Sequence, residues 1–163
     1  MIPRFNSALF LGGNQLTGTI PTMLGTMDKL TWLTWLTLQG NNLNGPIPSE
    51  LGKCRQMEAM DLRNAQLTGS IPRELGDLDQ LQMLLLSENA LTSSIPSELA
   101  SNARLRFLSL ANNQLTGRIP KFSFSSAVDL SMLEDPLEFN AGLILPSQEA
   151  FLNFWVTNCR HWR

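Results

Sequence analysis

The chain has 163 residues, a formal net charge of −2, 16% charged residues and 43% hydrophobic residues. This length suffices for one domain, and the small net charge predicts neither a nucleic-acid footprint nor a patch that binds anionic membranes. No apolar run approaches the roughly 20 residues of a membrane span, and two cysteines are too few for a disulfide framework. The first six residues lack the basic and then apolar pattern of a secretory signal.

Five Ile-Pro pairs occur along the chain, with isoleucine at positions 20, 47, 71, 95 and 119. The interval is 27 residues once and 24 residues three times, and a leucine stands four positions before each pair. Glycine stands two positions before four of the isoleucines, and Ser93 takes its place in the fourth copy. A period shared by five copies identifies an internal repeat.

One copy, residues 75–91, indicates how a repeat would fold. Leu84 and Leu86 alternate with other residues, which is the period of a short strand with alternate side chains inward. Stacked copies would pair these strands about 4.8 Å apart in a parallel sheet. Each inward leucine then contributes roughly 1.5–3 kcal/mol of burial, but only when a neighbouring coil covers it. Ile-Pro suits an extended or turn backbone on the opposite side of the coil, since proline fixes φ and has no donor.

Four copies have an asparagine two positions before the leucine, at Asn14, Asn41, Asn89 and Asn113. We expect its amide to lie inside the turn and to bond backbone groups of adjacent coils. The third copy has Ala65 at this position, and Asn64 comes one residue early. If Asn64 cannot reach inward, a backbone group loses a partner, which costs about 1–3 kcal/mol in a dry interior.

The segment from Leu108 to Pro120, L-S-L-A-N-N-Q-L-T-G-R-I-P, resembles the 24-residue plant-type leucine-rich repeat, L-x-x-L-x-L-x-x-N-x-L-[TS]-G-x-I-P-x-x-L-G. The resemblance covers about residues 9–120. Members of that family include ectodomains of receptor-like kinases and receptor-like proteins, and soluble inhibitors of microbial polygalacturonases. The resemblance implies an α/β solenoid of about five repeats, a right-handed superhelix with a short concave parallel β-sheet and a 3-10 or irregular convex side. The Thr-Gly-x-Ile-Pro segments would form a second small sheet.

The first interval is too long because Thr31-Trp32-Leu33 is repeated as Thr34-Trp35-Leu36. We expect residues 31–33 to loop out, so that Leu36 and Leu38 stay in register with the other copies. Cys54 stands where other copies have Met27 or Leu78. This position predicts a small buried thiol, and a reactive cysteine is the alternative.

We predict a repeat array over residues 1–120, with a truncated first repeat, and an irregular tail over residues 121–163. The period stops after Pro120, and the paired cysteines that usually cap family members are absent from both ends. An amphipathic helix near residues 147–156 would cover the last coil, and Ser147 is a suitable helix start. Two short resemblances offer other interpretations. Residues 139–143 are similar to a segment that follows the last repeat in receptor kinases, and residues 148–162 to the start of an amino-terminal cap.

The sequence lacks recognisable catalytic, phosphate-binding and metal-binding motifs. The single histidine, His161, lies near the carboxyl terminus, and neither a glycine-rich phosphate loop nor metal-ligand spacing occurs. Glu134 and Asp135, beside Pro136, are interpreted as a solvated turn and not as paired catalytic acids. We therefore predict no catalytic residue, cofactor or metal site. A kinase domain, if the protein has one, would lie outside these residues.

The outward side chains of the predicted sheet fall into three columns. The central column is Phe10, Thr37, Asp61, Leu85 and Ser109, the next is Gly12, Gln39, Arg63, Ser87 and Ala111, and the preceding one is Ala8, Trp35, Ala59, Met83 and Phe107. We expect an exposed apolar stripe of Trp35, Met83, Leu85 and Phe107, with Asp61 and Arg63 between its members. The predicted partner-binding residues are Trp35, Thr37, Gln39, Asp61, Arg63, Met83, Leu85, Phe107 and Ser109. The alternative is that these side chains pack along the sheet, or against the insertion and the tail.

These features favour a module that binds a protein or peptide ligand, with a co-receptor among the candidates, in a receptor-like ectodomain of signalling or defence. The alternative is a soluble inhibitor of a microbial enzyme, similar to the polygalacturonase inhibitors. Ice binding ranks last, because it needs a flat threonine-rich face and the concave columns are mixed. We expect neither nucleic-acid binding nor membrane insertion. The resemblance implies an extracellular or cell-surface location, but without a signal peptide, a membrane span or an Asn-x-Ser/Thr sequon a cytoplasmic one stays open.

Overall fold

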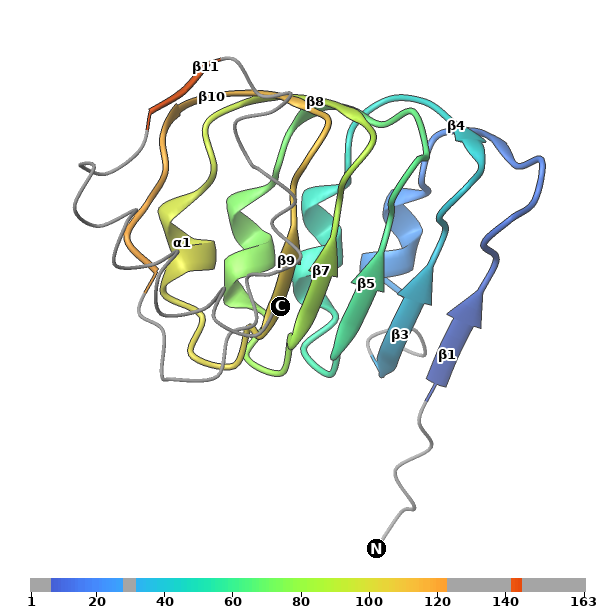
Figure 1. Ribbon diagram of the computed structural model, residues 1–163. Helices are drawn as coiled ribbons and strands as arrows, with labels where there is room; N and C mark the ends of the chain where they lie inside the picture. Colours follow the sequence, from blue (N-terminus) through green and yellow to red (C-terminus); the bar gives the residue numbers. More distant parts are fainter. Residues whose placement is uncertain (1–6, 28–31, 123–141, 145–163) are drawn as a thin grey trace, which may run out of the picture.

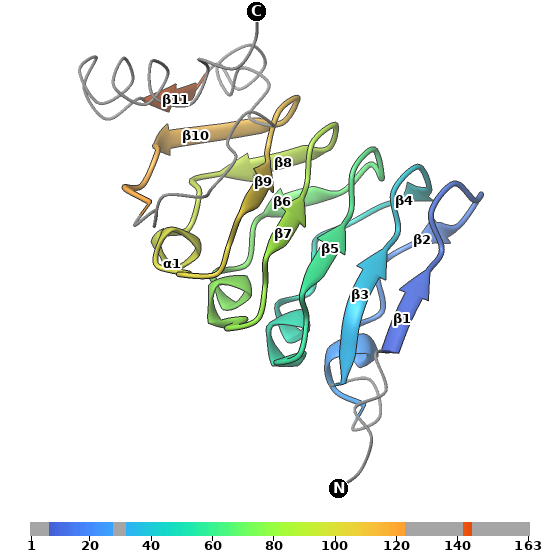
Figure 2. The ribbon, with the colours of Figure 1, turned by 60° about the horizontal axis from the view of Figure 1, so that its bottom comes forward.

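The computed structural model describes residues 7–27, 32–122 and 142–144, and the statements below concern these residues. Successive repeats form coils that stack side by side into a curved solenoid (Figure 1). Each coil contributes to three rows, which are a strand row on the concave side, a second strand row and a row of short helices (Figure 2). The predicted solenoid is therefore confirmed.

The concave row is a five-stranded parallel sheet with one strand from each repeat. Its strands, in spatial order, are β1 (Ser7–Phe10), β3 (Leu33–Thr37), β5 (Ala59–Asp61), β7 (Met83–Leu85) and β9 (Phe107–Ser109). Spatial order follows chain order because every coil returns to the same edge, as the period predicts.

The second row is formed by residues that precede the Ile-Pro pairs, as expected, together with one strand of the tail, and it is split. The strands β2 (Thr17–Gly18) and β4 (Asn42–Leu43) form one pair, and β6 (Thr68–Ser70), β8 (Ala90–Ser93), β10 (Gln114–Arg118) and β11 (Gly142–Ile144) form a four-stranded sheet. A single isolated bridge joins the two parts, between Pro46 and Thr68. Proline has no N–H to donate to a ladder, which accounts for the weak link at this step.

The strand β11 belongs to the tail that was predicted as irregular. It pairs in parallel with β10, with Thr116 opposite Gly142 and Arg118 opposite Ile144. No Ile-Pro pair or leucine period marks this segment, so the repeat pattern could not have predicted it. The predicted helix near residues 147–156 lies outside the described residues.

The convex row consists of the 3-10 helices η1 (Thr22–Gly25), η2 (Ser49–Lys53) and η3 (Arg73–Asp77) and the one-turn helix α1 (Ser97–Ala100). Each begins directly after the proline of an Ile-Pro pair, and that proline is extended, with φ between −67° and −61°. Because proline fixes φ and lacks a donor, it suits the residue before a helix start. The predicted 3-10 character is confirmed for three of these four coils.

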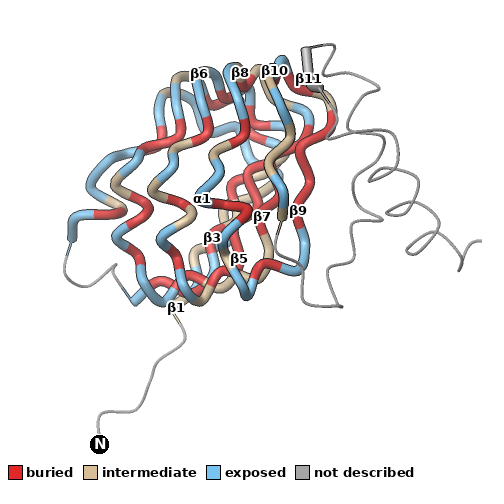
Figure 3. The backbone as a smooth tube through the Cα atoms, turned by 90° about the vertical axis from the view of Figure 1, so that its left-hand side faces the viewer, coloured by how far each residue is buried: buried red, intermediate tan, exposed pale blue. Residues whose placement is uncertain are grey.

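The leucines and isoleucines of the repeat point into the space between the rows and form one core. In the tube of Figure 3 buried residues recur at matching places in successive coils. Leu36, Leu84 and Leu86 are fully buried, and Ile71 is 3% exposed. Neighbouring coils on both sides exclude water from each of these side chains, which is the condition for their contribution to stability.

The first coil is less well covered than the others. Leu16, Met23 and Met27 are 38%, 54% and 46% exposed, although their counterparts in later coils are buried or polar. Only one face of this coil has a described neighbour, because η1 packs on η2 and β1 pairs with β3. Burial of a repeat side chain therefore depends on having a coil on each side.

The predicted asparagine bonds are present and join adjacent coils. Asn89 donates from Nδ2 to the carbonyl oxygens of Leu62, at 2.8 Å, and Leu86, at 3.0 Å. Its Oδ1 accepts from the backbone N–H groups of Ala65, at 3.1 Å, and Leu67, at 2.9 Å. One side chain thus satisfies backbone groups of its own coil and of the preceding one, which stabilises the stack.

The third coil lacks this bond. Ala65 is fully buried at the asparagine position, whereas Asn64 is exposed, with φ of 47°. The backbone N–H of Leu43 therefore has no asparagine oxygen to which to donate, whereas the Leu67 N–H donates to Asn89 Oδ1. The left-handed backbone at Asn64, which asparagine tolerates better than most residues, turns its side chain away from the interior.

The prediction that residues 31–33 loop out is wrong for Leu33. Leu33 lies in β3 and is 1% exposed, because it fills the leading core position that Leu81 fills in a later coil. In the pairing of β1 with β3, Thr34 is skipped, so that Ser7 is opposite Leu33 and Ala8 is opposite Trp35, which is a β-bulge. Leu36 stays in register, opposite Met60, as predicted. Leu33 and Leu81 stand 48 residues apart, which is two 24-residue repeats, so all three extra residues precede Leu33, and residues 28–31 lie outside the described part.

Candidate partner-binding surface

The predicted outward columns lie in register on the concave sheet. Paired Cα positions run Ala8, Trp35, Ala59, Met83 and Phe107 in one column and Phe10, Thr37, Asp61, Leu85 and Ser109 in the next. The third column, which begins at Gly12, follows directly after the strands, and its backbone bonds continue the ladder, as from Gly13 N–H to the Gln39 carbonyl at 2.8 Å. The sequence thus predicted the placement of these residues correctly.

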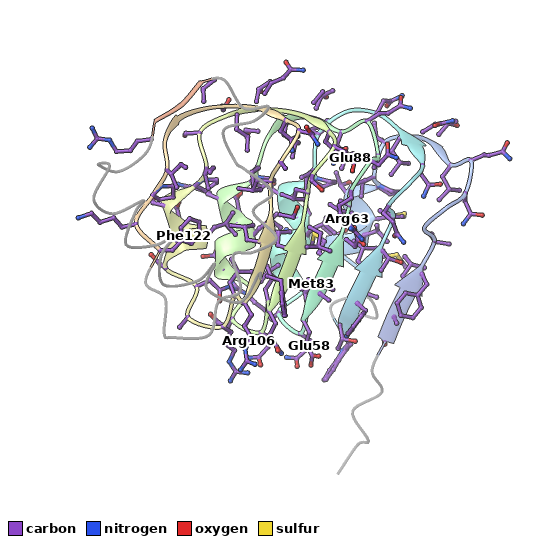
Figure 4. The ribbon with its side chains drawn as sticks, viewed as in Figure 1. Glu58, Arg63, Met83, Glu88, Arg106 and Phe122 are labelled. Carbon is purple, nitrogen blue, oxygen red and sulfur yellow. The ribbon has the colours of Figure 1, made fainter. Side chains whose placement is uncertain are left out.

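An apolar ridge runs along the concave face. It consists of Phe10, Trp35, Met83 and Phe107, of which Phe10, Trp35 and Phe107 are 64%, 40% and 36% exposed and Met83 is half-buried. The rings of Phe10 and Trp35 meet edge to face, with centroids 6.3 Å apart and planes inclined by 67°. Figure 4 labels Met83 on β7, near the middle of the sheet. Phe10 was not among the predicted binding residues, although its place in the central outward column could have indicated its exposure.

Ala59 closes the gap in this ridge. It lies between Trp35 and Met83 in the register and is only 3% exposed. A methyl side chain is short, so the larger residues on either side can lie close to it. The ridge is therefore an apolar surface with a buried small residue beneath it, which favours contact with apolar groups of a partner.

Leu85 is not part of an exposed stripe, which corrects the prediction. It is 4% exposed, and its neighbours in the register, Asp61 and Ser109, are each 6% exposed. Strands about 4.8 Å apart bring side chains of one column into contact, and the concave curvature brings them closer still. Outward direction in a strand therefore did not guarantee exposure in this column.

Asp61 and Arg63 form a bidentate ion pair within one repeat. The Arg63 guanidinium donates from Nε to Oδ1 at 2.9 Å and from Nη2 to Oδ2 at 2.8 Å, and the Arg63 backbone N–H donates to Oδ1 at 3.2 Å. The Asp61 side chain is 9% exposed and the Arg63 side chain 40%. Two parallel charge-assisted bonds fix the orientation of both groups.

Gln39 packs over Gly12 in the adjacent strand. A Cβ on Gly12 would overlap the Gln39 side-chain amide, so a larger residue there would require Gln39 to move. The Gln39 Oε1 atom is buried and has no hydrogen-bond partner among the described residues. A buried acceptor without a partner costs about 1–3 kcal/mol. Gln39 is therefore a side chain whose reorientation toward a ligand would be favourable.

Charged residues flank the ridge at the lower edge of the sheet. Figure 4 shows Glu58 and Arg106 at this edge. Each lies one residue before the ridge column, and the Arg106 N–H and the Glu58 carbonyl take part in backbone bonds with Gln82, both at 2.8 Å. The arrangement is an apolar strip with a polar rim, as in many protein interfaces.

The family model described as Leucine Rich Repeat matches residues 32–54, 80–102 and 104–125. The crystal structure of the BIR2 ectodomain from Arabidopsis thaliana is 36% identical, with a TM-score of 0.71, over 83% of this chain and 68% of that one. This chain belongs to the plant-type leucine-rich repeat family. No curated protein matches it.

Two further structures are similar to this leucine-rich repeat array. The BIR3–SERK2 complex from Arabidopsis thaliana matches with 40% identity and a TM-score of 0.66, over 74% of this chain and 64% of that one. A plant ice-binding protein matches with 33% identity and a TM-score of 0.65, over 70% of this chain and 36% of that one. The array thus spans less than two thirds of the matched chain in the BIR3–SERK2 complex.

The leucine-rich repeat array also has a polar outer face on its second sheet. Thr68, Ser70, Ser94 and Thr116 are exposed there and Thr92 is half-buried, while the intervening Leu67 and Leu91 are fully buried. A shallow groove lies between this sheet and the helix row, with Ile-Pro pairs along it. The threonines that precede the Ile-Pro pairs therefore lie on this face, whereas the three concave columns contain one threonine, Thr37.

Cys54 is a buried thiol of the array, as its repeat position predicts. It is fully buried, and its Sγ donates to the Leu24 carbonyl at 3.5 Å. Burial raises the pKa of the Cys54 thiol above its ordinary value, because the thiolate would lose its hydration. A raised pKa disfavours the reactive thiolate and supports the structural interpretation over the reactive one.

None of the helices that the structure describes is long and apolar enough to cross a membrane. The same part of the leucine-rich repeat array contains no group of three histidine, cysteine, aspartate or glutamate side chains placed to hold a metal ion.

Proposed function

We propose that this chain is a protein- or peptide-binding segment of a receptor-like ectodomain in signalling or defence, and that its concave face is the binding surface. The observation that carries the proposal is the apolar ridge, which presents Trp35 and Phe107 from a paired sheet. Large aromatic side chains supply most of the energy at protein interfaces. Strands held in a ladder lose little further freedom on binding, which lowers the cost of association.

The similarity to the BIR3–SERK2 complex supports a protein partner, with a co-receptor as one candidate. The similarity to the BIR2 ectodomain supports an extracellular or cell-surface location. On this proposal the array binds a protein or peptide partner and catalyses no reaction, and any kinase domain lies outside these residues. A soluble inhibitor of a microbial polygalacturonase would use the same concave face, and an inhibition assay with the purified chain separates the two functions.

Site-specific photo-crosslinking tests the proposed surface. A benzophenone amino acid replaces Phe107 on the ridge in one variant and Met23 on η1 in a matched variant, because both positions are exposed and apolar. With the chain displayed on plant cells, we expect the probe at position 107 to form adducts with a cell-surface protein and the probe at position 23 to form none. Equal adducts from both positions, or adducts from position 23 alone, contradict the proposal.

Ice binding is a second candidate, favoured by the polar outer face and by similarity to a plant ice-binding protein. Short hydroxyl side chains at strand spacing, about 4.8 Å, can hold ordered water. Inhibition of ice recrystallisation by the full chain, abolished by Thr92→Lys and retained by Trp35→Ala, would support this function. Loss of inhibition in Trp35→Ala but not in Thr92→Lys would oppose it.

A further inference from the structure

The middle of the concave face, between the flanking residues Glu58 and Arg106, offers almost no unpaired charge to a ligand. Its three outward columns comprise fifteen positions, of which only Asp61 and Arg63 are charged. These two residues neutralise each other through the bidentate pair. A charged group of a ligand would therefore find no complementary charge in the middle of this face.

Opening the ion pair for a ligand is unfavourable. Both carboxylate oxygens of Asp61 already accept bonds from Arg63, and Asp61 is 6% exposed. A ligand ammonium would have to displace the guanidinium, and a ligand carboxylate would meet an Arg63 whose charge Asp61 already neutralises. Displacement of the guanidinium would take the charged partner from a nearly buried carboxylate, which is unfavourable.

The apolar ridge has the dimensions of a short extended chain. Trp35 and Phe107 stand three strand spacings apart, which is about 14 Å. An extended peptide that crosses the strands covers this length with about four or five residues at roughly 3.3 Å each. Its alternate side chains point to one face and recur about every 7 Å, so two or three of them can reach the ridge.

We infer that the ligand of this surface is an uncharged extended segment whose alternate side chains are apolar and pack along Trp35, Met83 and Phe107. The inference rests on the proposed function and adds the chemistry of the partner. Backbone groups of such a segment meet the polar residues above the ridge, where the side-chain oxygen Oε1 of Gln39 lacks a partner among the described residues. Affinity then comes from apolar burial and little from charge attraction.

A random 12-residue peptide library displayed on phage, selected against the immobilised full chain, tests the inference. We expect the enriched peptides to carry alternating apolar residues and no charge over the contact stretch. Their dissociation constants should change less than twofold between low and high salt, because uncharged contacts are not screened. Trp35→Ala and Met83→Ala should weaken binding about tenfold, while Met23→Ala, an equally conservative change on η1, should not.

The outcomes distinguish a failure of the inference from a failure of the proposed function on which it rests. One outcome is a set of peptides that bind through Trp35 and Met83 but carry conserved charges and lose affinity in high salt or in Asp61→Asn. This outcome overturns the inference and leaves the proposed function intact. Selection without any peptide that depends on the ridge overturns both. A dimer of the full chain in sedimentation experiments that dissociates in Trp35→Ala would make a second copy the occupant, and this too overturns the inference.

Discussion

Gly76 of η3 packs directly against the backbone of Glu98 in the next coil. A Cβ on Gly76 would lie 2.8 Å from the Glu98 carbonyl oxygen and 2.6 Å from its Cβ. Gly25 and Gly52 make the same approach to Glu50 and Glu74. The fourth coil has Ala100 instead, at the end of α1. The glycines therefore set how closely the coils can stack on the convex side.

Gly76→Ala should lower the free energy of unfolding by about 1–3 kcal/mol, because the added methyl forces two coils apart. The measurement is equilibrium unfolding in urea. Ala100→Gly is the matched change at the equivalent position and should cost only about 0.5–1 kcal/mol, from backbone entropy. Equal stability of Gly76→Ala and the wild type would show that the coils can shift without loss.

Asn89→Ala should cost at least about 2 kcal/mol, since buried backbone groups in two coils lose their partners. Asn14 occupies the same repeat position in the first coil, where, among the described residues, its amide donates to the Leu11 and Gly12 carbonyls of its own coil. Asn14→Ala should therefore cost about 0.5 kcal/mol or less. Thermal unfolding of the two variants makes the comparison, and similar losses would refute the role of the inter-coil bonds.

Ala65→Asn should raise the free energy of unfolding by about 0.5–1.5 kcal/mol, because it supplies the bond that the Leu43 N–H lacks. The position is fully buried, so the outcome depends on whether an amide fits between the coils as it does at Asn89. Urea unfolding and the amide exchange rate of Leu43 report the result. A destabilised variant with unprotected Leu43 would show that the third coil is too narrow for the side chain.

Phe107→Asp should weaken partner binding at least tenfold while the far-UV dichroism stays unchanged, because Phe107 is 36% exposed on the ridge. Peptides selected on the wild-type chain serve as the binding probe. Met23→Asp, on the convex side, controls for the effect of a new charge on an exposed apolar site. Loss of the dichroism spectrum in Phe107→Asp would instead place this residue in the core.

The stability of the folded chain should fall at high pH through Cys54. Burial raises its pKa in the folded state, so the contribution is complete below the ordinary thiol value of 9.0 and declines as the pH rises toward the folded pKa. Above pH 9.0 the unfolded chain loses the proton first and is favoured. Urea unfolding as a function of pH should show a steeper decline for the wild type than for Cys54→Ser. Parallel curves would mean that burial of the thiol has no such effect.

The sequence by itself determined the coil. A 24-residue period with leucine, asparagine and Ile-Pro at fixed places predicts which side chains point inward, because each coil must return to the same edge to be covered by its neighbours. The register of Leu36 with Met60 and the amide bonds of Asn89 followed from that pattern. The outward columns followed too, since strand residues alternate between two faces.

Only the tertiary structure decided what the neighbouring coils leave exposed. Leu85 points outward yet is buried, because the exposure of a side chain depends on the residues beside it in other repeats. Leu33 joins the core because it stands at the first inward position of its strand, where an apolar side chain is buried. The strand β11 carries no repeat pattern and forms because β10 offers it an open edge. Periodicity fixes directions within one coil, whereas burial and edge pairing are properties of the stack.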